Sequence, residues 1–205
     1  MKEKSFVFFM ILGLIATSFG CAGSRIYLMD VRYIPERKAP PTSKLVGVCP
    51  FEDAREEKEK ETIGIRHRPG NKIDLLKLEG ITLSKSVTQA VKDYFAERGF
   101  EVTDCKGWDK SAEGLALLPE DLFLVVGGRI DSFKVEARSG ITITDTHYMV
   151  KMDASIGQVE KRKMVIRTIE SAPKSKKMGF DPDEVKAQLN GILTEVIQKL
   201  FEGKY

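Results

Sequence analysis

The chain has 205 residues, and its 33 lysine and arginine side chains against 30 aspartate and glutamate side chains give a formal net charge of +3 at pH 7. Charges of both signs alternate along most of the chain, which differs from the clustered basic surface of a nucleic-acid-binding protein. We therefore expect no nucleic-acid partner. The length suits one domain with a sizeable core.

The first residues have the layout of a bacterial export signal. Lys2 and Lys4 precede an apolar run from Phe6 to Ala16, and small residues lead to Cys21. The run is about a dozen residues long, short of the roughly 20 that a membrane-spanning helix needs. We expect residues 1–20 to be a signal peptide that is removed.

Gly20 and Cys21 resemble the end of a lipoprotein signal, in which the cysteine thiol receives a diacylglycerol and the chain is cut just before it. Ser18 stands where that pattern usually has leucine, and Ser18 with Gly20 would also suit an ordinary signal peptidase. Lipidation of Cys21 is the favoured prediction. Cleavage without lipid and an uncleaved anchor are the alternatives. Each buried methylene of an attached lipid would contribute about 0.8 kcal/mol to anchoring.

Residues 21–43 contain three prolines and mixed charge, which is typical of a tether between membrane and domain. Within it, Ile26–Ile34 could add an edge strand to a sheet. Residues 44–205 are expected to form a single domain.

The first half of this domain predicts a β-α-β unit. A short apolar run gives a strand at Lys44–Phe51, a 3.6-residue apolar period gives a helix at Thr82–Arg98, and Phe100–Cys105 gives the next strand. Two strands joined by a helix should be parallel, with a right-handed crossover. The polar stretch Asp53–Asn71 is expected to be a long loop, disordered or functional.

The second half predicts an antiparallel meander and a C-terminal helix. The strands are Leu122–Ala137, Ile141–Val159 and Lys163–Ser171, and the helix runs from a cap at Asp181 to Gly203. The expected fold class is α/β (α+β): a β-α-β unit, then the meander and the last helix, with two helices on one face of a four- to five-stranded mixed sheet.

Two cysteines besides Cys21 are open to two interpretations. In an exported protein Cys49 and Cys105 could form a disulfide. Each could instead be a small buried apolar residue, which is the favoured interpretation because sequence alone does not bring two residues together.

No recognised catalytic or metal-binding motif is present in the sequence. His67 and His147 lie far apart, without cysteine or carboxylate at a zinc-ligand spacing. Asp145, His147 and Asp153 share one face of a predicted strand and support a hydrolase only weakly, since exposed strand residues are mostly solvated. We expect a non-catalytic protein with no metal and no cofactor.

One short motif resembles a known family. Its residues are Pro50, Phe51, Asp53, Arg55, Ile63 and Gly64. The Pro-Phe-x-Asp-x-Arg run followed by an Ile-Gly pair is similar to the YajG-type family of bacterial lipoproteins. The resemblance implies an envelope lipoprotein with an α/β domain on the inner leaflet of the outer membrane, without a catalytic residue. Ala22 after Cys21 fits outer-membrane sorting, and inner-membrane anchoring stays an alternative.

The motif itself has two interpretations. Pro50 can end the strand, while Asp53 and Arg55 can fix the loop backbone, because such residues favour turns for local reasons. Contact with a partner is the less favoured alternative.

Three functions remain from the sequence. The first is a non-catalytic envelope lipoprotein that is anchored in the membrane by its lipid and binds an envelope protein or lipid partner through a sheet edge or curved face. The alternative is an accessory subunit of a lipid or lipopolysaccharide transport system, because lipopolysaccharide-assembly lipoproteins are similar in element order. A periplasmic hydrolase is the weakest hypothesis.

Overall fold

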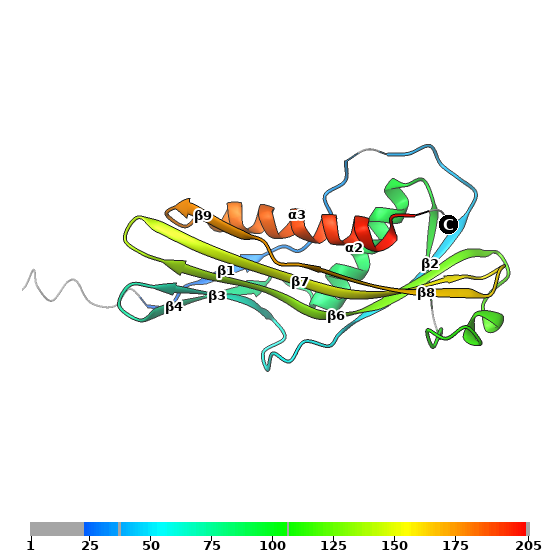
Figure 1. Cartoon of the computed structure of the whole chain (residues 1–205), viewed down its shortest axis with the longest axis horizontal. Helices are drawn as coiled ribbons and strands as arrows, with labels where there is room; N and C mark the ends of the chain where they lie inside the picture. Colours follow the sequence, from blue (N-terminus) through cyan, green and yellow to red (C-terminus); the bar gives the residue numbers. More distant parts are fainter. Residues whose placement is uncertain (1–22, 37, 106, 204–205) are drawn as a thin grey trace, which may run out of the picture.

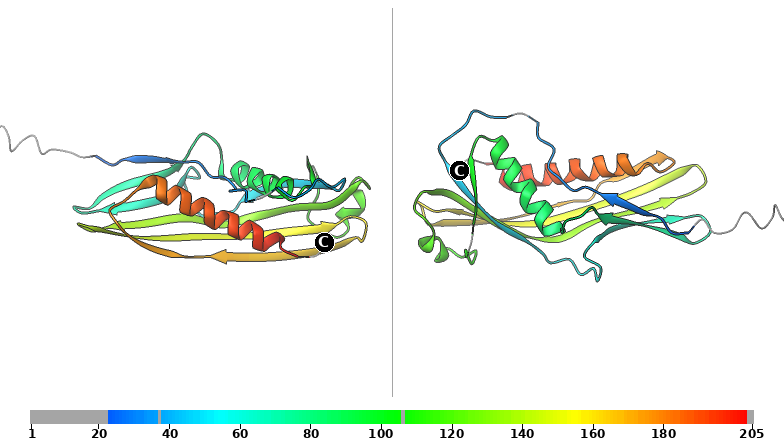
Figure 2. Two further views of the ribbon diagram at one scale, coloured as in Figure 1. Left: turned by 90° about the horizontal axis from the view of Figure 1, so that it is seen from above. Right: turned by 180° about the vertical axis from the view of Figure 1, so that it is seen from behind.

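The computed structural model describes residues 23–36, 38–105 and 107–203. Over these residues the chain forms one mixed sheet of nine strands, with α2 (Leu83–Glu97) and α3 (Pro182–Phe201) on one face (Figures 1 and 2). The strands are β1 (Ile26–Met29), β2 (Leu45–Asp53), β3 (Thr62–Arg68), β4 (Lys72–Leu78), β5 (Glu101–Asp104), β6 (Leu122–Ser139), β7 (Ile143–Gln158), β8 (Lys163–Ser171) and β9 (Lys174–Met178). The α+β fold class is confirmed.

Two long antiparallel strands, β6 and β7, run through the whole sheet. With 18 residues, β6 extends for about 60 Å at about 3.3 Å per residue. Along its outer side β6 pairs with β2 over its first half and with β3 over its second half, both in parallel. The outer side of β7 is likewise divided between β8 and β9, which Pro173 separates. The sheet therefore has two halves that share β6 and β7.

The predicted β-α-β unit is present. β2 and β5 are parallel neighbours, and α2 lies in the connection that leads from β2 to β5. The Thr82 side chain caps the first turn of α2, and Gly99 follows the helix with φ +83°, a conformation that favours glycine. Between β2 and α2, however, the chain inserts the β3–β4 hairpin.

The long loop expected at Asp53–Asn71 is therefore wrong over Thr62–Arg68. Thr62–Arg68 is strand β3, and only Ile63 and Gly64 in it are fully buried, so the segment reads as polar. The sheet is also larger than four to five strands, because β3, β4 and β9 add to the predicted set and the optional edge strand is present as β1. Their pairing depends on distant partners more than on their own apolar pattern.

The main core lies between the helices and the sheet. The apolar stripe of α2 meets that of α3 through aromatic rings, with the Phe95 and Phe201 centroids 5.0 Å apart. Complete burial of such a side chain contributes about 1.5–3 kcal/mol. This ring contact holds the C-terminal ends of the two helices together over the start of β6.

A smaller core lies on the opposite face of the sheet at that same end. It contains Trp108, Leu115 and Leu122 with the two cysteines. Cys49 and Cys105 are buried and joined in a disulfide, with a Cα–Cα distance of 4.5 Å. The structure thus contains the disulfide alternative rather than two separate thiols.

The segment expected to be a tether is packed on the domain. β1 pairs with β4 at the sheet edge, and Met29, Val31 and Tyr33 are buried. The Asn190 side chain accepts a hydrogen bond from Arg32 N (3.1 Å) and donates one to the carbonyl of Asp30 (3.0 Å). Residues 26–34 are therefore part of the fold.

Cys21 and the predicted signal peptide lie outside the described residues. Among the helices that the structure does describe, none has the length and apolar character required to cross a membrane.

We predict that a Cys49→Ser, Cys105→Ser double variant loses about 2–4 kcal/mol of unfolding free energy, because the disulfide closes a loop with a sequence separation of 56 residues. Urea unfolding of both proteins, with and without reductant, measures this loss. Reductant should lower the stability of the wild type to that of the variant. An equal stability of the oxidised wild type and the variant would contradict the prediction.

Candidate functional site

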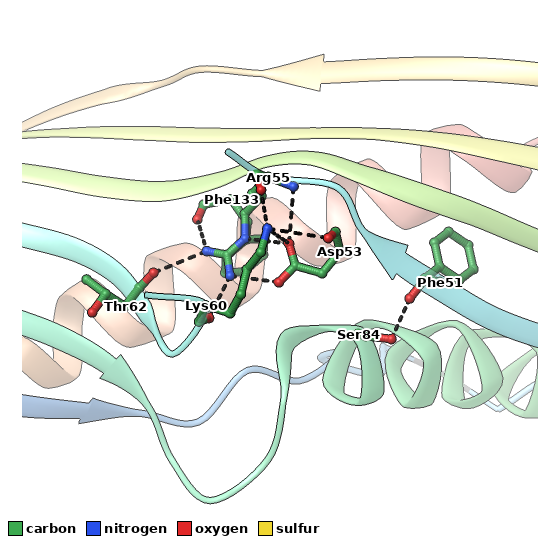
Figure 3. A network of polar contacts seen from close by, with 7 residues as sticks. All are labelled: Phe51, Asp53, Arg55, Lys60, Thr62, Ser84 and Phe133. Carbon is green, nitrogen blue, oxygen red and sulfur yellow. Dashed lines mark hydrogen bonds and ion pairs between the residues drawn. The ribbon is translucent and has the colours of Figure 1, made fainter. Parts of the chain in front are cut away.

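Arg55 of the sequence motif is a buried ion-pair centre (Figure 3). Its Nε and Nη2 donate to the two carboxylate oxygens of Asp53 at 2.8 and 2.9 Å. The remaining donors reach three backbone carbonyls, those of Lys60 (2.7 Å), Thr62 (3.2 Å) and Phe133 (3.3 Å). All five N–H bonds of the guanidinium are used, so none is left to bind a ligand.

The position of Arg55 in the sheet explains this arrangement. The pairing of β2 with β6 ends at Ile130 of β6, and the pairing of β3 with β6 begins at Val135 of β6. Phe133 lies in the gap between these two pairings, where its carbonyl has no strand partner on that side, and Arg55 donates to it. A buried carbonyl without a donor costs about 1–3 kcal/mol. The guanidinium avoids this cost by supplying the hydrogen bond that a neighbouring strand would otherwise donate.

The other motif residues also serve packing. Phe51 is completely buried, and its ring lies where a Cβ on Gly128 would clash with it. A Cβ on Gly64 would clash with the carbonyl of Val135, so only glycine permits this close strand pairing. Ile63 is buried. Pro50 is exposed and does not end β2 as expected, because the strand continues to Asp53.

The electrostatics of the pair follow from its geometry. Burial alone would raise the pKa of Asp53, but hydrogen bonds and charge from Arg55 outweigh it, and the pKa of this carboxyl lies below its ordinary value. Asp53 therefore stays ionised and paired at neutral pH. This supports a structural rather than a catalytic role for the motif.

The residues of the hydrolase hypothesis do not form a site. Asp145 and Asp153 are eight residues apart on β7, about 26 Å at 3.3 Å per residue. Asp153 binds Arg129 (3.2 Å) and Thr168 (2.6 Å), and His147 is exposed opposite Glu136. Within the described part of the chain, no three His, Cys, Asp or Glu side chains gather as a potential metal site.

The structure instead contains a hollow that the sequence did not predict, which we call the distal cavity. It lies where the C-terminal ends of both helices meet the first residues of β2, β5 and β6 and measures about 440 Å³. Half of its lining residues are aromatic, and the lining comprises Ala39, Lys44, Tyr94, Phe95, Arg98, Phe100, Phe123, Phe201, Glu202 and Gly203. This volume lies in the range of small-molecule sites.

Two cations stand against the rings of the distal cavity. The Lys44 ammonium is 4.0 Å from the centroid of Phe123, and the Arg98 guanidinium is 5.2 Å from that of Tyr94. Burial raises the pKa of Tyr94, so its phenol is neutral at physiological pH. The cavity therefore offers apolar faces beside positive charge, with Glu202 as the one carboxylate in its lining.

A second, more polar hollow of about 380 Å³ shares Ala39 and Arg98 with the distal cavity. Above both runs the segment around Ala39, which is held to the end of α2. Glu97 accepts hydrogen bonds from the Tyr33 hydroxyl and from Glu36 N, and Ala39 N donates to the Glu97 carbonyl at 2.7 Å. Burial, and then contact with Glu97, raises the pKa of Tyr33.

Sequence reasoning missed this cavity because its aromatic residues come from α2, α3, β6 and the start of β5. Tyr94 and Phe95 were assigned to the buried stripe of a helix, and Phe100 and Phe123 to strands. The one local signal is that Phe100 and Phe123 stand close to the first residue of their strands.

Comparison with known proteins shows the fold alone. No protein-family model and no curated protein matches the chain. A crystal structure of a DUF330-family protein from Xanthomonas campestris is similar with a TM-score of 0.55 at 16% identity, covering 86% of this chain and 92% of that one. An uncharacterized protein gives a TM-score of 0.50 at 11% identity, covering 86% and 95%. A lipoprotein from Neisseria meningitidis is more distant, with a TM-score of 0.40 at 9% identity, covering 76% and 99%.

We predict that Arg55→Ala destabilises the protein by about 3–5 kcal/mol, because it leaves the Asp53 carboxylate without its partner and three carbonyls without donors. Chemical unfolding measures the loss. Arg129→Ala is the matched control, since Arg129 also binds an aspartate two residues away, Asp131, but is half exposed. Its loss should stay below about 1 kcal/mol. Equal losses in the two variants would contradict a special role for Arg55.

Proposed function

We propose that this chain is a lipid-anchored, non-catalytic protein of the bacterial cell envelope that binds an apolar, anionic partner in its distal cavity. The signal layout and Cys21 support an anchor, with the domain on the periplasmic face of the outer membrane as the favoured location. Binding rather than catalysis fits the dispersed positions of Asp145, His147 and Asp153.

The observation that carries this proposal is the separation of the two ends of the sheet. Gly23 accepts a hydrogen bond from Arg68 at 2.9 Å, beside the β3–β4 turn at one end. The distal cavity is at the other end, where α3 ends and β2 and β6 begin. With about 60 Å of β6 between them, an anchor at Cys21 would hold the cavity away from the membrane surface.

The lining of the distal cavity indicates the chemistry of its partner. Aromatic faces suit a hydrocarbon chain or an apolar side chain, and Lys44 and Arg98 suit a carboxylate or phosphate next to it. This lining also favours the second candidate, an accessory subunit of a lipid or lipopolysaccharide transport system. In that case the partner would be a lipid passed between subunits rather than a protein.

The anchor is tested by the intact mass of the protein extracted from the membranes of its native host. We expect a mature chain that begins at Cys21 and carries a diacylglyceryl or triacyl group, and we expect Cys21→Ser to lose both the lipid mass and the membrane association. A mature chain without lipid would contradict the anchor. Noncovalent lipid released from the same preparation would favour the transport candidate.

The distal cavity is tested with the apolar anion 1-anilinonaphthalene-8-sulfonate, whose fluorescence rises in apolar sites. We expect Lys44→Glu to weaken binding about tenfold, equivalent to about 1.4 kcal/mol, because it replaces an attractive charge at the rim by a repulsive one. Lys134→Glu, on an exposed position of β6 outside the cavity, makes the same change of charge and should bind like the wild type. Equal weakening in both variants would show that net charge alone governs binding.

A further inference from the structure

The end of the domain opposite the distal cavity is built from four short segments, which we call the cationic tip. They are residues 23–26 before and at the start of β1, 67–73 at the β3–β4 turn, 137–143 at the β6–β7 turn, and 175–179 in β9. Strand pairing places them side by side, since His67 pairs with Arg138 and Ile143 with Met178. In Figure 1 these turns lie together at the left end of the molecule.

The charged side chains within the four segments of the cationic tip are all positive. Its four segments contain six cations, Arg25, Arg68, Lys72, Arg138, Lys176 and Lys177, and no aspartate or glutamate. Four of the six meet carboxylates just outside the segments. Lys176, Lys177 and Arg138 pair with Asp145 (3.8 Å), Glu184 (2.7 Å) and Glu136 (2.9 Å). The mostly buried Arg68 pairs with the fully buried Asp74 (3.1 Å). The pairs of Lys176, Lys177 and Arg138 are exposed and contribute little, so they do not prevent these side chains from binding other anions, whereas Arg68 is held by Asp74.

Large apolar side chains project from the same surface. Ile141 is 98% exposed and Met178 is 89% exposed. They belong to neighbouring strand ends, since Gly179 N donates to the carbonyl of Thr142 at 2.9 Å. Ile26 and Ile73, 59% and 41% exposed, lie in two of the other segments. Apolar residues so exposed among cations are typical of a surface that enters the headgroup region of a membrane.

The chain before the tip indicates what lies against it. Gly23 is held to the tip by Arg68, and it is only two positions after Cys21. Two extended residues span at most about 7 Å. A lipid on Cys21 would therefore bring the tip to the membrane surface and leave no length for a spacer.

We propose that the cationic tip rests on the bilayer, with Ile141 and Met178 in the headgroup region and the cations other than Arg68 against the phosphates of anionic phospholipids. The inference rests on the lipid anchor of the proposed function. Each lysine or arginine near an anionic surface contributes about 1 kcal/mol. The tip would thus add a second attachment to the lipid and fix the orientation of the domain, which a lipid alone leaves free.

The experiment places a fluorescent reporter at the tip of the full lipidated protein, reconstituted in vesicles of phosphatidylcholine and phosphatidylglycerol with brominated acyl chains. Ile141→Trp introduces the reporter. Leu117→Trp is the matched control, because Leu117 is an apolar side chain with 88% exposure in the short helix beside the small core at the other end. Trp108, the one natural tryptophan, is buried beside that helix and supplies a constant background.

We expect bromine to remove roughly half or more of the added emission in Ile141→Trp and almost none in Leu117→Trp. Adding Lys176→Glu and Lys177→Glu should reduce the quenching, because two attractive charges become repulsive. Vesicle-bound protein without quenching in Ile141→Trp would overturn the inference and leave the lipid anchor intact. Quenching that the two glutamates do not change would overturn the role of the cations. Protein that does not stay with the vesicles would overturn the anchor and the inference together.

Discussion

The guanidinium of Arg55 holds the structure together at the point where its sheet would otherwise be interrupted. β2 and β3 follow the same side of β6 but leave Phe133 between them, and Arg55 supplies the missing donor while Asp53 balances its charge. The five donors tie residues of the connecting loop to β6 in one fixed geometry. The two halves of the sheet share β6 and β7, and the guanidinium closes the gap between them on the side of β2 and β3.

The consequence of one continuous sheet is a molecule with two different ends. The cationic tip carries positive side chains and exposed apolar residues, whereas the distal cavity combines aromatic faces with Lys44 and Arg98. A sheet about 60 Å long transmits the orientation of one end to the other. Attachment at the tip would therefore determine where the cavity points, which is the property that an anchored binding module needs.

Much of this fold could be predicted from the sequence, and the exceptions have physical causes. The helices were predictable because their apolar stripes, the caps Thr82 and Asp181, and Gly99 are local signals. β3 and β9 were not, because polar side chains dominate them and distant pairing stabilises them. Asp53 and Arg55 were found as a motif, but their role depends on a gap in β6 that no local pattern reveals. The cavity residues were assigned individually to helices and strands, and only the fold brings them together.

The most direct test of this account is energy transfer from the native Trp108 to a dansyl group on lipid headgroups, with the full lipidated protein in vesicles. Trp108 lies in the small core at the end of the sheet away from the tip, so no substitution is needed. The account predicts that the protein stays with the vesicles and that transfer from Trp108 is weak, because the tip faces the bilayer and the distal end points away. Strong transfer would show that the distal end lies on the membrane and would contradict the proposed orientation.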